Sequence, residues 1–288
     1  MSPRRLAIVL GPTAVGKTDW SIDLAEKYGS PVISCDSRQL YREMTIGTAV
    51  PSKDQLARVK HYFIQDHSVN QLYTAGKYEL EAVSLLEKLF DSGHETLVMS
   101  GGSGFYIDAV CNGLDDFPPS DLTLRSSLMT RLEAEGLGSL QAQLKELDPE
   151  SYGTLELSNR QRVVRALEVC LMTGRPFSSF KTAPNKKRSF EIEKIGLIRD
   201  RDILYDRINR RVDGMIEDGL VEEVRGLLPM KELPALQTVG YREIFDALEG
   251  KCAMEDAIEL VKRNSRRYAK RQISYWGRDK EIKWITPD

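Results

Sequence analysis

The segment from Gly11 to Thr18 constrains this chain more than any other, because it reads GPTAVGKT. It matches the phosphate-binding pattern G-x-x-x-x-G-K-[ST] at every fixed position. The apolar run 6–10 before it has the length of a buried strand, and apolar side chains recur after it at helical spacing until Gly29. A strand, a glycine loop and a helix in this order direct backbone N–H groups and the positive end of a helix at one anion. The segment therefore predicts a phosphate site, and the complete motif argues against a glycine turn that binds nothing.

Two side chains of this loop have expected roles. Lys17 would place a positive charge on the phosphate oxygens, and Thr18 would offer its hydroxyl to a magnesium ion. Kinases, ATPases and some transferases all share such a loop. The loop alone therefore leaves the reaction open.

Composition narrows the class of protein. The 288 residues are 41% hydrophobic and 29% charged, as in an ordinary soluble protein, and they allow one large domain or a core with a smaller insertion. The net charge of −2 means that a nucleic acid would have to bind a local basic patch. Four separated cysteines without a C-x-x-C pair favour a reducing cytoplasm over a metal or disulfide framework. We expect no signal peptide and no membrane span, because no apolar run approaches the roughly 20 residues that a span needs.

The ends of two further predicted strands bear on the chemistry. The apolar segment 31–35 is followed by Asp36, which should face the same crevice as the phosphate loop, since ligands of parallel sheets lie at the carboxyl ends of strands. Its carboxylate would be a metal ligand, a general base or a cap for a helix at 37–41, and residue type alone favours the cap. The strand 96–100 ends in Ser100 and glycines rather than in the aspartate that orders magnesium in most nucleotide hydrolases. This argues against ATP hydrolysis without excluding a small-molecule kinase.

The remaining patterns predict an α/β fold, in which a P-loop NTPase-like core with a parallel sheet flanked by helices carries a small all-helical insertion. We assign 1–112 and 190–288 to the core and 113–189 to the insertion, although a lid over the phosphate site is equally compatible with the inserted segment. The other expected elements are helices at 78–90, 122–135, 140–147, 158–173 and 203–218, a strand at 192–198, and loops at 45–67 and 181–188.

Two helical stretches are basic. Seven basic residues and no acidic ones lie between Lys262 and Arg278, with three aromatic residues among them, and three arginines lie within 158–173. Basic residues mixed with aromatic ones suit a phosphate backbone and stacked bases. Solvated helix faces have the same composition. The residues alone leave both interpretations open.

Taken together, these motifs resemble the tRNA dimethylallyltransferases, also called tRNA isopentenyltransferases, over nearly the whole chain. The matching blocks are GPTAVGKT, DSRQLY from Asp36, IGTA from Ile46, GGSGFYID from Gly101, RQRVVRALEV from Arg160, LYDRINRRVDGMIEDGLVEEV from Leu204, VGYRE from Val239 and YAKRQ from Tyr268. The chain has no Cys/His finger after these blocks, so it resembles the compact bacterial-type enzymes.

The resemblance implies a reaction and its site residues. A dimethylallyl group would pass from dimethylallyl diphosphate to N6 of the adenosine just 3′ of the tRNA anticodon, with Mg²⁺ as cofactor held by Thr18. The diphosphate contacts would be Gly11, Thr13, Ala14, Val15, Gly16, Lys17, Thr18, Arg201 and Arg211. Asp36 would be the general base, while Lys17, Thr18 and Arg211 would stabilise the leaving group. The tRNA contacts would be Asp36, Ser37, Arg38, Gln39, Ser103, Arg125, Gln161, Arg162, Val163, Val164, Arg165, Gln237, Gly240, Tyr241, Arg242, Lys270, Arg271, Gln272, Ser274 and Trp276, of which the valines look like packing residues. The partners would be the anticodon stem-loop of tRNA and the donor, no membrane is involved, and the protein should be a monomer.

Two departures and three alternatives stand beside this hypothesis. Ser103 and Phe105 replace a usual threonine and leucine, and Ser274-Tyr275 stands where Thr-Trp is usual, with Trp276 one place later. The role of any one of these aromatic residues is therefore open. An adenylate isopentenyltransferase acting on free AMP, an ATP-dependent small-molecule kinase and a non-catalytic RNA-binding protein are the alternatives. The basic C-terminal stretch favours tRNA over AMP, and the intact Lys17 and Asp36 argue against a non-catalytic protein.

Overall fold

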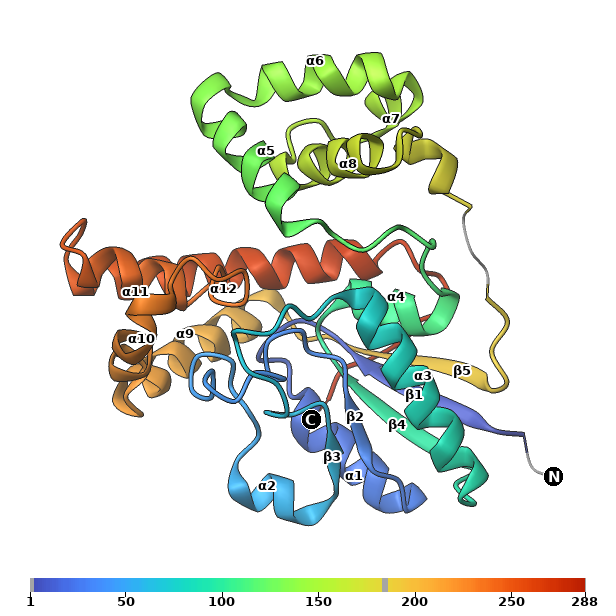
Figure 1. Ribbon diagram of the computed structural model, residues 1–288. Helices are drawn as coiled ribbons and strands as arrows, with labels where there is room; N and C mark the ends of the chain where they lie inside the picture. The colour runs from blue at the N-terminus through green and yellow to red at the C-terminus, as the bar shows by residue number, and fades with distance from the viewer. Residues whose placement is uncertain (1–2, 183–185, 288) are drawn as a thin grey trace. The chain divides into compact units, whose positions relative to one another are not determined.

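The computed structural model describes residues 3–182 and 186–287 (Figure 1). It divides into two compact units, the first made of 1–111 and 187–288 and the second of 112–186. The sequence led us to expect an insertion at 113–189. The first unit carries the sheet, and the second is built from helices.

The sheet of the first unit is entirely parallel. Its strands are β1 (Arg5–Leu10), β2 (Val32–Ser34), β3 (His61–Tyr62), β4 (Thr96–Gly101), β5 (Glu191–Leu197) and β6 (Lys283–Ile285). They lie in the order β3-β2-β4-β1-β5-β6, and each neighbouring pair is parallel. The predicted parallel sheet is confirmed, and β1, β2, β4 and β5 fall on the four predicted strand segments. The short strands β3 and β6 were not predicted, since two or three residues show no periodicity.

Alternation along β1 explains why helices cover both faces of this sheet. Leu6, Ile8 and Leu10 belong to one hydrophobic cluster, and Ala7 and Val9 belong to another. Successive side chains of a strand point to opposite faces, so a fully buried strand needs apolar residues on both. The first cluster includes residues of α3 (Ala75–Asp91), and the second includes residues of α1 (Lys17–Tyr28).

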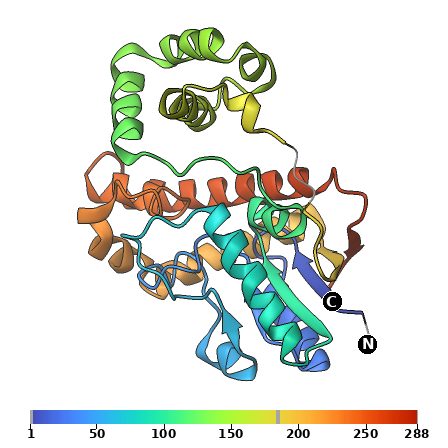
Figure 2. The same ribbon diagram turned by 45° about the vertical axis from the view of Figure 1, so that its right-hand side comes forward.

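The other helices of the first unit are mostly C-terminal. They are α2 (Lys53–Arg58), α4 (Gly104–Asn112), α9 (Arg201–Glu217), α10 (Leu220–Leu227), η2 (Leu228–Met230), α11 (Tyr241–Leu248) and α12 (Met254–Trp276). Figures 1 and 2 show the long α12, in red, with α9 and α11 packed along it. Helix α12 begins earlier than the basic stretch that predicted it, and its acidic first turn, Glu255 and Asp256, complements the positive end of the helix.

The second unit has its own core. Helices α5 (Leu122–Glu135), α6 (Leu137–Leu147), α7 (Pro149–Thr154), α8 (Arg160–Thr173) and the short η1 (Phe177–Phe180) surround a cluster of buried leucines, valines and alanine. The helices predicted at 122–135, 140–147 and 158–173 are confirmed. Of the predicted loop 181–188, residues 183–185 lie outside the described part of the chain.

Two local predictions were wrong. The predicted loop 45–67 contains α2 and β3, and α2 is short enough to depend on the capping box between Ser52 and Gln55. Asp36 is followed by turns at residues 37–40 and not by the helix considered at 37–41. Across 3–182 and 186–287, no helix combines the length and hydrophobicity that a membrane crossing requires.

Candidate active site

The phosphate loop has the conformation that its glycines predict. Gly16 lies in the left-handed region with φ of 108° and directly precedes α1, so the first turn of this helix opens toward the loop. At Gly11 a Cβ atom would lie 2.6 Å from the carbonyl oxygen of Leu197, which only glycine avoids. Across the loop, Lys17 Nζ donates hydrogen bonds to the carbonyl oxygens of Gly11 at 2.9 Å and Pro12 at 2.8 Å. The backbone thus forms a closed cradle with the ammonium group inside it.

The ammonium group of Lys17 has a lowered pKa. Burial, with a further contribution from the Arg211 guanidinium, lowers the pKa of Lys17 to about 8, although Asp36 acts in the opposite direction. A lysine that loses water and lies beside another cation gains more from an anionic ligand than an exposed one. The electrostatics of the loop therefore favour an anion.

The loop opens into a cleft of about 790 Å³. Thr13, Lys17 and Thr18 line it from the phosphate loop and the start of α1, and Asp36 lines it from the segment after β2. The opposite contributors include Arg207, Arg210 and Arg211, which lie three and four residues apart on α9 and so share a face. Arg211 Nη1 donates to Thr13 Oγ1 at 3.1 Å, which ties this cationic face to the phosphate loop.

Asp36 lies where the cleft meets a second pocket. This pocket has a volume of about 260 Å³ and shares Asp36, Thr13, Arg211 and Tyr268 with the cleft. The rest of its lining is partly apolar, with Ile208, Val212, Val239 and Val261, and Met215 lines both cavities. The cleft would therefore accommodate an anionic group at the phosphate loop, and the adjoining pocket would accommodate a partly apolar group beside Asp36.

The Asp36 carboxylate serves the local backbone as well. Its Oδ1 accepts hydrogen bonds from the backbone N–H of Arg38 at 2.8 Å and of Gln39 at 3.3 Å. This is the capping role that residue type favoured, applied to a turn instead of a helix. Because the same carboxylate lines the cleft, the cap fixes a potential proton acceptor in place.

Neighbouring side chains hold this turn and the phosphate loop together. Ser103 Oγ accepts the N–H of Ser37 at 3.0 Å, so the hydroxyl that replaces the usual threonine has a defined partner. Gln272 on α12 accepts the N–H of Thr13 through Oε1 at 2.9 Å and donates through Nε2 to the carbonyl of Gly102 at 2.8 Å. Helix α12 therefore bridges the phosphate loop and the glycine loop after β4.

The predicted tRNA-contact residues differ in how exposed they are. The exposed ones are Gln161, Arg162, Gln237, Arg242, Lys270, Arg271 and Ser274, and the partly buried ones are Ser37, Arg38, Gln39, Ser103, Arg125 and Arg165. Val163, Val164, Gly240, Tyr241, Gln272 and Trp276 are buried. Within this last group the valines pack in the core of the second unit, as their residue type indicated, and Tyr241 and Trp276 pack in the core of the first. Gln272 lines the cleft, and Gly240 lines the second pocket. Of the two adjacent aromatic residues, Tyr275 is 45% exposed and Trp276 only 4%, so Tyr275 is the one that a ligand could reach.

Among the predicted diphosphate contacts, Gly11, Val15 and Arg201 do not line the cleft. Arg201 is exposed at the start of α9, and its guanidinium lies over the ring of Tyr205, outside the lining of the cleft. Arg201 lies six positions before Arg207 on α9. This spacing directs the Arg201 side chain away from the face that Arg207 shares with Arg211. Instead, Arg207 Nε donates to the carbonyl of Ala14 at 2.8 Å, and Arg199 Nε to that of Val15 at 3.0 Å. Helical spacing from Arg211 would have identified Arg207.

Glu223 has a role in the site that sequence reasoning missed. Its Oε2 accepts the N–H groups of Thr45 at 2.9 Å and Ile46 at 2.7 Å, and its Oε1 accepts the N–H of Gly47 at 3.0 Å and the hydroxyl of Tyr241 at 2.7 Å. One carboxylate on α10 thus holds the 45–47 segment, which contributes to the walls of both cavities.

We expect Glu223→Gln to lower the free energy of unfolding by about 1–3 kcal/mol, because the amide nitrogen accepts no hydrogen bond and leaves donors unpaired. Turnover should fall as the 45–47 segment loosens. Tyr241→Phe is the matched control, since it removes one of the four donors and should cost less. Thermal unfolding and steady-state kinetics of the two variants test this order, and equal stability of Glu223→Gln and the unmodified protein would contradict it.

Comparison with known proteins identifies the family to which the chain belongs. The family model for IPP transferase matches residues 39–279. The chain is 48% identical over 286 residues to tRNA dimethylallyltransferase 1 of Phocaeicola vulgatus, covering 99% of this chain and 95% of that one. It is 50% identical over 283 residues to tRNA dimethylallyltransferase 2 of Parabacteroides distasonis, covering 98% and 94%.

Solved structures give the same result. The tRNA isopentenylpyrophosphate transferase of Bacillus halodurans matches with a TM-score of 0.71 and 34% identity, over 98% of this chain and 90% of that one. A eukaryotic dimethylallyltransferase acting on tRNA matches with a TM-score of 0.81 and 25% identity, over 98% and 74%. The predicted P-loop NTPase-like fold is therefore confirmed. The model, the sequences and the structures agree along nearly the whole length, and the chain belongs to the IPP transferase family.

Proposed function

We propose that this chain transfers a dimethylallyl group from dimethylallyl diphosphate to N6 of adenosine 37, immediately 3′ of the anticodon, in tRNAs that read codons beginning with U. The observation that carries the proposal is that Lys17 and Asp36 line one cleft, and that Asp36 also lines the partly apolar pocket that adjoins it. The tRNA dimethylallyltransferases that the chain resembles at about half of all positions support the same substrates.

The chemistry places charge where this site holds cations. Breaking the bond between the allylic carbon and its oxygen leaves a delocalised cation and a diphosphate whose negative charge grows. Lys17, Arg211 and the loop amides are in place to stabilise that leaving group, and preorganised donors of this kind supply large rate effects. Because Arg207 and Arg211 are fixed by hydrogen bonds to the loop, little reorganisation is needed.

Asp36 completes the step. As the exocyclic nitrogen of adenine forms its bond to the allylic carbon, one N6 proton passes to the Asp36 carboxylate. The amine is hardly basic, so a proton acceptor within hydrogen-bond distance matters more than a perturbed pKa. The adenine has to leave its stack to reach this depth, as in other enzymes that modify bases.

We also propose that Mg²⁺ accompanies the diphosphate. Thr18 lines the cleft, and residues 3–182 and 186–287 contain no cluster of three or more acidic, histidine or cysteine side chains that would hold a metal alone. This donor set fits Mg²⁺, which keeps several waters and binds through few protein ligands plus substrate phosphates. When bound there, the ion would neutralise charge on the diphosphate oxygens.

The tRNA would be bound by exposed basic side chains of both units. On α12 these are Arg267, Lys270 and Arg271, next to the exposed ring of Tyr275. Such residues suit phosphate contacts and base stacking. As a tRNA-modifying enzyme, the protein would act in the cytoplasm, and its monomeric state stays a prediction.

The direct test is reconstitution. Purified protein, dimethylallyl diphosphate, Mg²⁺ and unmodified tRNA should yield prenylated adenosine at position 37, detected by mass analysis of nuclease digests. Parallel reactions with AMP as the acceptor, and with ATP and a pool of metabolites, test the two alternative enzymes. Prenylation of AMP but not of tRNA, or phosphorylation without prenylation, would overturn the proposal.

The lowered pKa of Lys17 predicts how donor binding depends on pH. The folded protein loses this proton near pH 8 while the unfolded chain retains it, so the charged form of Lys17 is progressively lost above pH 8. Affinity for dimethylallyl diphosphate should then decrease, by at most about tenfold per pH unit. The Lys17→Arg variant stays charged and should lack this decrease. Calorimetric titrations between about pH 6.5 and 9.5 test the difference, and parallel profiles for the two proteins would contradict the assignment.

A further inference from the structure

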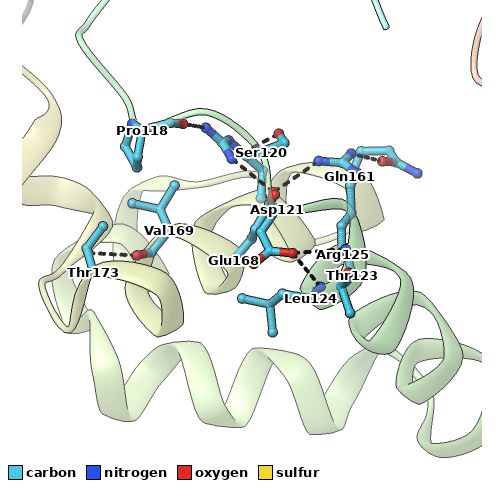
Figure 3. A network of polar contacts seen from close by, with 11 residues as sticks. Pro118, Ser120, Asp121, Thr123, Leu124, Arg125, Gln161, Glu168, Val169 and Thr173 are labelled. Atoms are coloured by element: carbon cyan, nitrogen blue, oxygen red, sulfur yellow. Dashed lines mark hydrogen bonds and ion pairs between the residues drawn. The ribbon is translucent and has the colours of Figure 1, made fainter.

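The second unit contains a buried carboxylate that the proposed reaction does not use. Glu168 on α8 is 0% exposed, and within the described residues its Oε1 accepts no hydrogen bond (Figure 3). Its Oε2 lies 3.2 Å from Arg125 Nη1 and 3.0 Å from Arg165 Nη1. Two guanidinium groups from different helices therefore meet at one buried oxygen.

Further hydrogen bonds fix the orientation of each arginine. Arg125 Nη2 donates to Gln161 Oε1 at 2.7 Å, as Figure 3 shows. Arg165 Nη2 donates to the carbonyl of Pro118 at 2.5 Å, and its Nη1 to Ser120 Oγ at 3.1 Å. The two side chains are still 32% and 24% exposed. The two guanidinium groups are thus held in place by hydrogen bonds, while part of each arginine side chain stays exposed.

Stability alone does not explain this arrangement. A buried carboxylate costs free energy of desolvation, and apolar replacements of buried ion pairs are often neutral or stabilising. The residues around Glu168 on α8, Val164 and Leu167, belong to an apolar core that would accept such a replacement. What the carboxylate adds is orientation, because its Oε2 accepts a hydrogen bond from Arg125 Nη1 and forms an ion pair with Arg165 Nη1. Planar guanidinium groups held in register are suited to the oxygens of phosphates.

We propose that Glu168 is a positioning residue for RNA binding, which holds Arg125 and Arg165 as one preorganised pair that contacts backbone phosphates of the tRNA. This inference rests on the proposed function, because it assumes that tRNA is the substrate. It adds a buried acidic residue to an interface that would otherwise be described by its basic residues alone.

The direction in which Glu168→Gln changes the affinity for tRNA tests this inference. Glu168→Gln removes a negative charge, so if only net charge mattered the variant would bind tRNA more tightly and with a steeper salt dependence. If Glu168 orients the arginines, the dissociation constant for tRNA should instead rise about tenfold, and the salt slope should fall by about one. The dissociation constant for dimethylallyl diphosphate and the turnover at saturating tRNA should stay unchanged, since neither depends on this pair.

Glu156→Gln is the matched control. Glu156 pairs with Arg162 at 3.4 Å, but both side chains are more than half exposed, at 63% and 58%. The charge change is the same, while no buried pair is disturbed. This control should bind tRNA as the unmodified protein does, or slightly more tightly. An equal loss of affinity in both variants would overturn the inference.

A second substitution keeps the test valid if Glu168→Gln does not fold. Arg125→Lys preserves the charge but cannot contact Glu168 and Gln161 together. It should weaken tRNA binding several-fold, whereas Arg131→Lys, on the same helix but paired with the exposed Glu135 instead of a buried carboxylate, should not. Unchanged affinity of Arg125→Lys, with tRNA still prenylated by the unmodified protein, would overturn this inference alone. Failure of the unmodified protein to bind tRNA would overturn the proposed function as well.

Discussion

Replacing Lys17 with alanine should reduce the rate of prenyl transfer by about 10³-fold, the upper end of what one preorganised donor at a developing anion contributes. The reason is the position of the ammonium group, which lies inside the phosphate loop within hydrogen-bond distance of Gly11 and Pro12 and next to Arg211. Without it the leaving diphosphate keeps the loop amides but loses the charge nearest to them. The effect should appear in donor affinity and in turnover.

Controls for this variant separate the donor site from the RNA site. The tRNA dissociation constant should not change, since Lys17 is partly buried and donates to two carbonyls of the phosphate loop. Lys60→Ala removes an exposed lysine of the same unit and should leave both constants intact. Lys17→Ala with the donor affinity and turnover of the unmodified protein would mean that the diphosphate binds elsewhere.

Asp36→Asn should lower turnover by about 10² to 10⁴-fold, the range that a general base supplies. Asparagine retains a side-chain oxygen that can accept from the N–H groups of Arg38 and Gln39, so the turn is preserved. It lacks the basicity of a carboxylate. The substitution therefore removes the proton acceptor and leaves the cap, and single-turnover kinetics with bound tRNA measures the chemical step.

Asp36→Ala provides the comparison, because it removes both roles. If Asp36 is the base, the asparagine and alanine variants should be almost equally slow, while only alanine should lower thermal stability, by about 1 kcal/mol. If the asparagine variant were fully active and only the alanine variant slow, Asp36 would act as a cap alone.

Structure could be predicted from the sequence where one motif or one long periodic pattern determines it. The glycines of the phosphate loop, the apolar strand before it and the helices of the second unit were predicted because each depends on local residues. Asp36 was placed at the correct edge of the sheet because β2 is parallel to β4 and ends beside it. Its three possible roles were left open, since residue type does not reveal which cavity a carboxylate lines.

Other features depend on contacts between distant segments. Gln272, which stays a predicted tRNA contact, also joins two loops that lie 259 and 170 residues away in the sequence. Glu223 looks like any acidic residue of an amphipathic helix, and only the fold brings the 45–47 segment to it. Trp276 and Tyr275 are adjacent, and the packing of α12 alone decides that Tyr275 is exposed.

The most direct measurement is a crystal structure with a non-reactive analogue of dimethylallyl diphosphate and Mg²⁺. The diphosphate should lie against the N–H groups of residues 14–18 with Lys17 and Arg211 in contact, and the allylic carbon should point toward Asp36. A diphosphate bound outside this loop, with Lys17 still donating to the carbonyls of Gly11 and Pro12, would contradict the account.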